Sequence, residues 1–474
     1  MEDKTRLAVE QALKHGADYA EARAQRDFGH TLTLNNGIPE PVTVTRRLGI
    51  GIRVIVDGSM GFASTNSLES SQIRTAAETA VKIARAATRL ISKPSELAPE
   101  KSCEDKWEVR MKVDIGEVSI EEKLDVLFSI EKALSLDQVN VSLPSRILLL
   151  DDELTEKFYL NSEGSKIRGI VPRISLFFIL TAEETGKGTI QRMRHEAQSR
   201  GWEAVKEWDP PALATGEARM LGRMLREGKQ PPTGEIDLVL GSEVTGIICH
   251  ESCGHPQEAD RILGREGAQA GESYVTREML GKRIGSEHVT IIDDPTLPNS
   301  YGFYMYDDEG VRAKPRTLIK DGVIFDFLHN RETAAEFGVS SNAAARSIAY
   351  DREPIIRMGN TFMKPEDHTL DELVEDINFG VYMKSFMEWN IDDRRYNQRY
   401  VGLEAYTIEN GKIGTPVRNP ILEVTTPRLY ASVDAVGKEM EYSGATCGKG
   451  DPQQGAPVWT GGPPIRIRKI RLGG

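Results

Sequence analysis

The sequence has few cysteines and no long apolar run. Four cysteines in 474 residues are too few for a disulfide framework. The longest apolar run, residues 174–182, is interrupted by Ser175 and Thr181 and is far too short to span a bilayer. The first residues also lack the charged-then-apolar order of a signal peptide. We therefore expect a cytoplasmic protein without a membrane partner.

An excess of basic residues is also missing. The chain has 60 lysines and arginines against 72 acidic residues, a net charge of −12. Nucleic-acid binding depends on the neutralisation of phosphates, so this balance argues against a nucleic-acid partner. The length is sufficient for two or three domains with a sizeable core.

One short segment carries the residue types of a metal-dependent hydrolase. His250 is followed directly by Glu251, and His255 comes five positions after His250. On a regular helix a spacing of four places two side chains about 40° apart, whereas a spacing of five places them about 140° apart. Two imidazoles that bind one ion therefore require a helix that bulges or ends between them. Gly254 is the residue best able to permit this change.

The residue types of this segment are those of a catalytic zinc site. A catalytic zinc ion keeps about three protein ligands and an open position for water. His250 and His255 would be two ligands, and Glu251 would move the proton as a general base. Cys447, in a glycine-flanked segment that we interpret as a flexible loop, is the better candidate for the third ligand. Cys249 is poorly placed on the helix, and we interpret it as a small buried side chain, like Cys253.

Other interpretations of these residues remain open. A structural zinc ion held by Cys249, His250, Cys253 and His255 would leave Glu251 without a function. The chain would then be a non-catalytic scaffold subunit. A zinc-dependent dehydrogenase would also use cysteine and histidine ligands, but the sequence has no dinucleotide fingerprint.

Further polar residues have two interpretations each. We interpret the pair His195-Glu196 as surface residues, because no second histidine follows it at a useful spacing. The acidic run 307–309 is either a cation-binding or supporting carboxylate cluster, or a polar turn. Arg346, Arg357 and Asn360 would bind a peptide backbone or hold loops together, and we favour the former.

The pattern of apolar residues predicts an α+β protein with two parts. Residues 1–230 combine helices over 4–15, 67–87, 119–134 and 211–228 with alternating strand-like segments, and indicate a mixed α/β domain of antiparallel strands. The segment 228–234, rich in glycine and proline, predicts the boundary. Residues 231–474 indicate a strand-rich, barrel-like domain that carries the metal helix.

A series of motifs in fixed order resembles a known family. After the metal segment, which continues as His255-Pro256-Gln257-Glu258, come Asp307-Asp308-Glu309-Gly310, Arg346-Ser347 and finally Cys447-Gly448-Lys449. This order resembles the TldD branch of the TldD/PmbA metalloprotease family, whose HExxxH motif and late cysteine hold the metal. The resemblance covers nearly the whole chain and is strongest over 235–450.

The resemblance implies a function and a partner. By its motifs, one zinc ion per chain is held by His250, His255 and Cys447, and Glu251 is the catalytic base. It implies a zinc-dependent metallopeptidase that hydrolyses unstructured peptides, bound in extended form by their backbone. It also implies a heterodimer with a TldE- or PmbA-like subunit that lacks the metal motif, or otherwise a homodimer. Ser252 and Cys253 depart from the small apolar residues usual at these positions in bacterial members.

Overall fold

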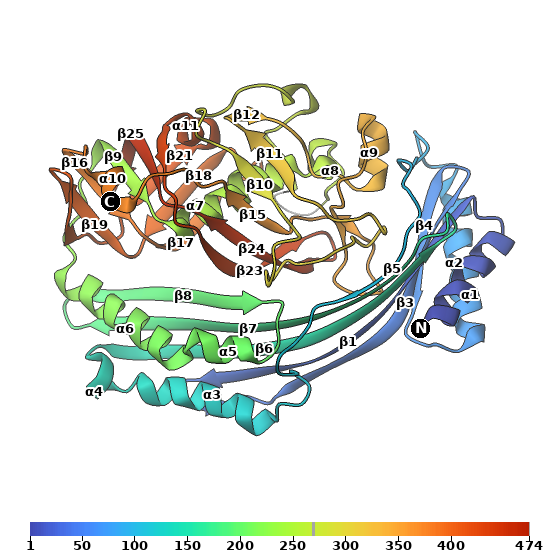
Figure 1. Cartoon of the computed structure of the whole chain (residues 1–474), viewed down its shortest axis with the longest axis horizontal. Coiled ribbons are helices and arrows are strands. Elements are labelled where there is room, and N and C mark those ends of the chain that lie inside the picture. The colour runs from blue at the N-terminus through green and yellow to red at the C-terminus, as the bar shows by residue number, and fades with distance from the viewer. Residues whose placement is uncertain (268–270, 474) are drawn as a thin grey trace.

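A long curved sheet from the first half of the chain wraps around a strand-rich second half in the computed structural model (Figure 1). The structure describes residues 1–267 and 271–473. The expected α+β class is confirmed, with mostly antiparallel strands in the first half and the metal segment within the second. No helix in these two ranges is long and apolar enough to cross a membrane.

The first half forms one sheet and the helices that cover its outer side. The strand order is β4-β3-β1-β6-β7-β5, with β2 beside β1 and β8 beside β7. The strands are β1 (Tyr19–Asn35), β2 (Ile38–Pro39), β3 (Thr43–Val56), β4 (Ser59–Thr65), β5 (Glu104–Glu108), β6 (Ser142–Asn161), β7 (Lys166–Glu184) and β8 (Gly188–Gln198). The helices are α1 (Glu2–Lys14), α2 (Ser70–Ala87), α3 (Ile120–Ala133), α4 (Leu136–Val139), α5 (Glu203–Trp208) and α6 (Pro210–Glu227).

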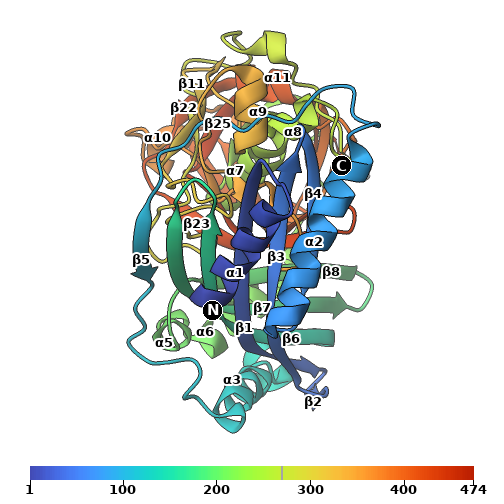
Figure 2. The ribbon, with the colours of Figure 1, turned by 90° about the vertical axis from the view of Figure 1, so that its right-hand side faces the viewer.

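The alternation along β1 explains how the sheet is covered on both sides. Ala22 and Ala24 face outward and pack with the apolar faces of α1 and α2, which cover this end of the sheet (Figure 2). Arg23, Gln25 and Asp27 point the other way and are also buried, because the second half lies against this face. The concave side of the sheet is therefore polar, although these three of its residues are buried.

The second half is built on two larger sheets. One has the order β17-β18-β21-β25-β9-β16-β19-β20, with β22 beside β25, and the other has the order β12-β11-β10-β15-β24-β23. The strands of the first are β9 (Gly234–Leu240), β16 (Phe379–Met383), β17 (Phe386–Ile391), β18 (Asn397–Gly402), β19 (Ala405–Glu409), β20 (Lys412–Pro416), β21 (Ile421–Thr425), β22 (Val433–Val436) and β25 (Ile465–Gly473). Those of the second are β10 (Ile291–Asp293), β11 (Arg316–Lys320), β12 (Val323–Ile324), β15 (Asn360–Met363), β23 (Glu441–Lys449) and β24 (Gln454–Gly462).

The remaining elements of this half are short. The two-stranded sheet consists of β13 (Ala345–Arg346) and β14 (Ile355–Ile356). The helical segments are α7 (Ser242–Cys249), η1 (His250–Gly254), η2 (His255–Gln257), α8 (Ala259–Ile262), η3 (Arg277–Met279), α9 (Arg331–Phe337), α10 (Leu370–Val374) and α11 (Thr426–Ala431). Apolar residues of α7 lie in one core with those of both larger sheets, which fixes the helix between them.

Candidate metal centre

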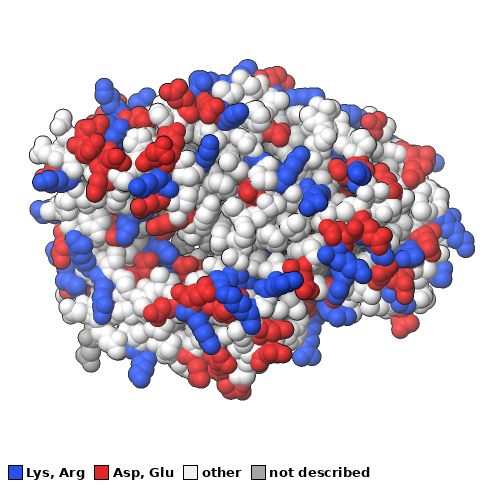
Figure 3. Space-filling view, in the orientation of Figure 1, with Lys and Arg blue, Asp and Glu red and all other residues white. Residues whose placement is uncertain are grey.

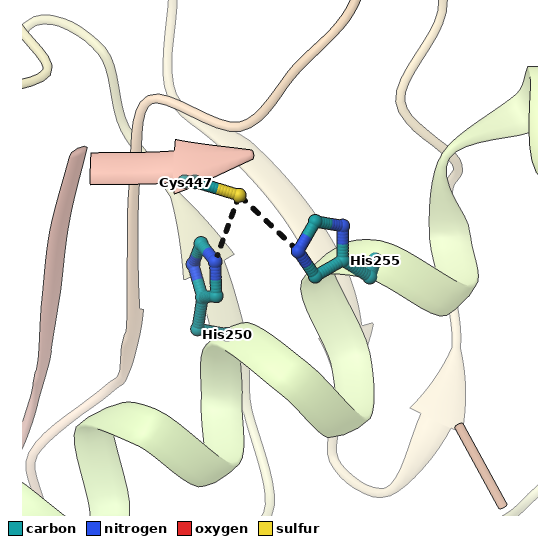
Figure 4. A group of neighbouring side chains, drawn as sticks. All are labelled: His250, His255 and Cys447. Carbon is teal, nitrogen blue, oxygen red and sulfur yellow. Dashed lines mark hydrogen bonds between the residues drawn. The ribbon is translucent and has the colours of Figure 1, made fainter. Parts of the chain in front are cut away.

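The segment between the two histidines is an irregular helix. The regular helix α7 ends at Cys249, a π-helical turn follows over His250–Gly254, and a short 3₁₀ turn begins at His255. A π turn contains one residue more than an α turn, so a spacing of five brings both imidazoles to the same side (Figure 4). The predicted bulge between the histidines is confirmed.

The reason for a glycine at position 254 differs from the predicted one. Gly254 has φ −54 and ψ −61, ordinary helical values that any residue adopts. A Cβ atom there would lie 1.9 Å from Sδ of Met358. Gly254 is therefore required because the helix lies close to its neighbour, and not because of backbone freedom.

Three potential ligand atoms converge at this helix. Cys447 Sγ lies 3.3 Å from Nε2 of His250 and 3.2 Å from Nε2 of His255 (Figure 4). The three atoms lie within 4.8 Å of one another, and all three residues are buried. In the described ranges they form the one group of three or more His, Cys, Asp or Glu side chains close enough to share a metal ion.

Cys447 lies on a strand, so the predicted flexible loop is wrong. β23 pairs with β24 along its whole length, from Glu441 opposite Gly462 to Lys449 opposite Gln454. The glycines that suggested a loop serve close packing: a Cβ on Gly444 would lie 2.5 Å from Cβ of Ala197. Burial would raise the pKa of Cys447, but His255 and Arg357 nearby lower it to about 7. A thiolate, the form that binds zinc, is therefore accessible near neutral pH.

A buried carboxylate orients His255. Glu258 Oε2 lies 3.0 Å from Nδ1 of His255 and also accepts a hydrogen bond of 2.6 Å from Arg261 Nε. Lys449 Nζ, near the end of the strand that carries Cys447, lies 3.2 Å from the same oxygen. A proton on Nδ1 leaves Nε2 free to bind a metal ion. Glu258 thus links His255 to the strand that carries Cys447.

Glu251 faces the same site and is held by a hairpin from another part of the chain. Its Oε2 accepts a hydrogen bond from Nη1 of Arg395, in the turn between β17 and β18, and Trp389 on β17 bonds the same carboxyl group. Burial alone would raise the pKa of Glu251, but Arg395, the two imidazoles and Trp389 bring it below its ordinary value. The carboxylate is therefore ionised and can accept a proton.

Arg395 has an unfavourable backbone conformation. Its φ is 63°, in the left-handed region that favours glycine. Its buried Nε has no hydrogen-bond partner among the residues that the structure describes. A long side chain at such a position indicates that the side chain is needed there.

The candidate site opens into a cavity of about 360 Å3. Aromatic and apolar side chains form much of its wall, including Phe177, Phe386 and Trp389. His195 lies in this wall, and a bond to the backbone of Gly444 holds it there, so its interpretation as a surface residue is wrong. Burial lowers the pKa of His195 to about 4, so the ring is neutral.

The other cysteines of the segment do not point to this site. Cys249 and Cys253 are fully buried, as predicted, and burial raises the pKa of both thiols. Neither belongs to the group of converging ligand atoms.

The acidic run 307–309 connects the two halves of the chain. Asp308 pairs with Lys157 at 2.8 Å, and Glu309 Oε1 lies 2.7 Å from Nη2 of Arg53. Asp307 accepts hydrogen bonds from backbone amides of its own loop and of Ala345. All three carboxyl groups thus have structural partners.

The three residues predicted to bind substrate are buried, and one of them, Arg357, contacts the backbone of a candidate ligand. Arg357 donates hydrogen bonds to the backbone oxygens of Cys447 and Gln454, the latter at 2.7 Å. Arg346 donates to Pro457 O at 2.9 Å. Asn360 is fully buried and bonds Asp294, Ser300, Gly302 and Trp459. Their binding of a peptide remains a prediction.

The sequence contains a signal for Glu258, a residue of the site that was not predicted. Glu258 follows His255 by three positions, the spacing of neighbours on one helical face, so its contact could have been found. Arg395 and Trp389 are distant from the motif in sequence, and nothing in their surroundings marks them.

Comparisons with known proteins agree with this site. Three family models match the chain: PmbA/TldA metallopeptidase domain 1 over residues 20–84, the central domain over 113–224 and the C-terminal domain over 233–474. A protein named metalloprotease from Methanothermobacter thermautotrophicus is 34% identical over 98% of this chain and 97% of its own. A zinc metalloprotease TldD homolog from Saccharolobus solfataricus is 28% identical over 98% of this chain and 99% of its own.

A solved structure shares the fold. TldE from Thermococcus kodakarensis has a TM-score of 0.73 at 18% identity, over 99% of this chain and 100% of its own. At that identity the likeness concerns the fold alone. The family models and the relatives together show that the chain belongs to the PmbA/TldD family of metalloproteases.

Proposed function

We propose that the chain is a zinc-dependent peptidase in which His250, His255 and Cys447 hold one zinc ion and Glu251 is the general base. One observation carries the proposal: three converging ligand atoms and an ionised carboxylate face one cavity. A scaffold with structural zinc has no need of this carboxylate.

The residues present fit a zinc ion. Two imidazole nitrogens and one thiolate are ligands that zinc prefers, and three protein ligands leave a position open. Burial lowers the pKa of His250, which keeps its ring in the neutral form that binds metals. When bound, a zinc ion activates water at neutral pH and polarises a carbonyl group.

The chain's own groups then move the proton and position the reactants. Glu251 accepts a proton from water and delivers it to the leaving amine. Arg395 donates a hydrogen bond to Oε2 of Glu251, and the indole of Trp389 bonds the same carboxyl group. Together these contacts restrict the rotation of the Glu251 side chain. Glu258 keeps Nδ1 of His255 protonated.

A strand at the edge of its sheet supports extended peptides as substrates. β23 is the last strand of its sheet, and in the described part of the chain it pairs with β24 alone. Residues 443–448 of this strand line the same cavity as Glu251. A peptide that pairs with this edge would be bound by its backbone, largely independent of sequence. A folded domain has no free strand to offer.

The substitution Glu251→Gln tests catalysis. It removes the base and keeps the ligands, so we expect folded, zinc-loaded protein with peptide hydrolysis reduced at least about a hundredfold. Glu243→Gln is a matched control, because Glu243 lines the same cavity but pairs with Arg192 at 2.7 Å. Near-normal hydrolysis by Glu251→Gln would exclude the proposed base and favour the scaffold subunit.

A TldE-like subunit is the partner that we propose, with a homodimer as the alternative. The structural likeness to TldE supports related subunits of similar shape. The assay incubates one peptide, free and inside a stable domain, with the chain alone and with the partner. We expect cleavage of the free form by the complex. Equal cleavage of both forms would refute the requirement for an extended substrate, and full activity from a monomer would refute the requirement for a partner.

A further inference from the structure

A second cavity, of about 250 Å3, lies between the concave side of the first sheet and the β23–β24 hairpin. Lys157 and Arg173 of the first sheet line one side, and Ala456 and Pro457 of β24 line the other. Thr446, next to the candidate ligand Cys447, lines both this cavity and the one that contains the metal centre. The two cavities are therefore neighbours along β23.

Four arginines line this second cavity, and three of them donate their hydrogen bonds to backbone carbonyls. Arg173 donates to Tyr301 O at 3.1 Å and to Phe303 O at 3.3 Å. Arg346 and Arg357 donate to carbonyls on and around β23 and β24. The two are 8% and 1% exposed, and Nε of Arg357 has no hydrogen-bond partner within the described ranges.

These three guanidinium groups have no carboxylate within salt-bridge distance in the part of the chain that the structure describes. Five carboxyl groups also line the cavity, and each has a partner other than these three arginines. Asp308 pairs with Lys157 at 2.8 Å, Asp152 with Lys123 at 2.8 Å, and Glu153 with Arg47 at 3.3 Å. Asp307 accepts backbone amides. Asp151 has a hydrogen bond from Thr31, and burial raises its pKa to about 6.

The three guanidinium groups line one cavity, and Arg346 and Arg357 are buried. Burial, together with repulsion from Arg173 and Arg357, lowers the pKa of Arg346 to about 10, although Tyr304 and Asp308 act in the opposite direction. On the face of the molecule that Figure 3 shows, acidic and basic side chains are intermixed. Buried cations without an anion are costly, and proteins normally pair them.

We propose that this cavity is a carboxylate-binding site, and that its ligand is the free C-terminal carboxylate of a peptide bound at the neighbouring metal centre. The planar guanidinium group matches a carboxylate with two parallel hydrogen bonds. The acidic groups of the same wall oppose a dianion, so a singly charged carboxylate fits better than phosphate. This inference rests on the proposed peptidase function and assigns the part of the site that selects a chain end.

The test measures binding without cleavage. The full chain carrying Glu251→Gln and loaded with zinc is titrated by calorimetry with one unstructured peptide in three forms. These are the free acid, the C-terminal amide, and the amide with one internal glutamate. We expect the free acid to bind at least about tenfold more tightly than either amide, as charge-assisted hydrogen bonds predict.

Variants of the arginines connect this preference to the cavity. Arg173→Gln should reduce the preference for the free acid to about threefold or less and leave affinity for the amide unchanged. Arg346→Lys keeps a charge but not the planar fork, and should weaken the preference while the protein stays folded. Arg26→Gln is the control, because its side chain is 57% exposed on the same sheet and does not line the cavity.

Several outcomes would overturn the proposal, and one would overturn only the peptidase function. Equal affinity for acid and amide, or a full preference in Arg173→Gln, would show that the arginines bind no terminal carboxylate. Tight binding of the glutamate-containing amide would assign a side-chain carboxylate, and stronger competition by inorganic phosphate would assign a different anion. If wild-type protein cleaves no peptide while the preference is present, the proposed peptidase fails and the carboxylate site remains.

Discussion

Replacement of Arg395 by glycine separates the function of its side chain from that of its backbone. Arg395 has a φ of 63° and donates a hydrogen bond to Glu251, and the two side chains are 14% and 10% exposed. Glycine accepts this φ without strain, whereas alanine does not. Both substitutions remove the guanidinium group. We expect Arg395→Gly to be more stable than Arg395→Ala by about 1 kcal/mol, the lower range for a strained backbone position.

The two variants should nevertheless lose activity equally. Without Arg395 the Glu251 carboxylate is free to rotate, and a misplacement of about 1 Å can cost about a hundredfold in rate. We expect kcat for peptide hydrolysis to fall about ten- to a hundredfold in both, with KM and zinc content little changed. Chemical denaturation gives the stabilities. The control is Arg394→Ala, since Arg394 is 63% exposed and lies 3.9 Å from an exposed Glu272. If activity followed stability, or if Arg394→Ala lost as much, the positioning of Glu251 by Arg395 would be refuted.

Three further substitutions test separate parts of the account. Cys447→Ala should lose most of its zinc, as measured by atomic absorption, while Cys249→Ala keeps it; the reverse would contradict the ligand assignment. Gly254→Ala places a Cβ against Met358 and should lower the free energy of unfolding by about 1–3 kcal/mol, and the additional substitution Met358→Ala should restore part of it. Burial lowers the pKa of His329 to about 4, so between about pH 6.5 and 4 the unfolded chain binds a proton that the folded chain does not. The contribution of His329 to stability is therefore complete above about pH 6.5 and is lost as the pH falls. His329→Gln should reduce the fall in the free energy of unfolding between pH 7 and pH 5 by about 2 kcal/mol. An unchanged fall would show that His329 is not the group responsible.

The sequence patterns predicted which helices and strands are present better than they predicted how long each strand is. The helix over residues 4–15 corresponds to α1 (Glu2–Lys14), and that over 119–134 corresponds to α3 (Ile120–Ala133). Residues 19–35 form one long strand, β1, because it lies between two partners, β3 and β6, that together pair with it along its whole length. The polar centre of β1 gave no sign of this, since its buried residues face a polar interface rather than an apolar core.

The metal site was predictable where its residues are close in sequence. The spacing of His250 and His255 required an irregular helix, and a π turn supplies it. β23 was predicted as a loop, because glycines that permit close packing resemble glycines that permit flexibility. Arg395 could not be found, since its contact with Glu251 depends on how two distant segments fold together. The predicted domain boundary near residue 230 remains a prediction.

The zinc K-edge X-ray absorption spectrum of the purified protein tests the central claim most directly, because it reports the atoms around the metal ion. We expect one sulfur at about 2.3 Å and two imidazole nitrogens at about 2.0 Å, with one further light atom in the open position. Cys447→Ser should remove the sulfur signal and keep both imidazoles. Two or more sulfurs, or a sulfur that persists in Cys447→Ser, would place the zinc on Cys249 or Cys253 and contradict the site described by His250, His255 and Cys447.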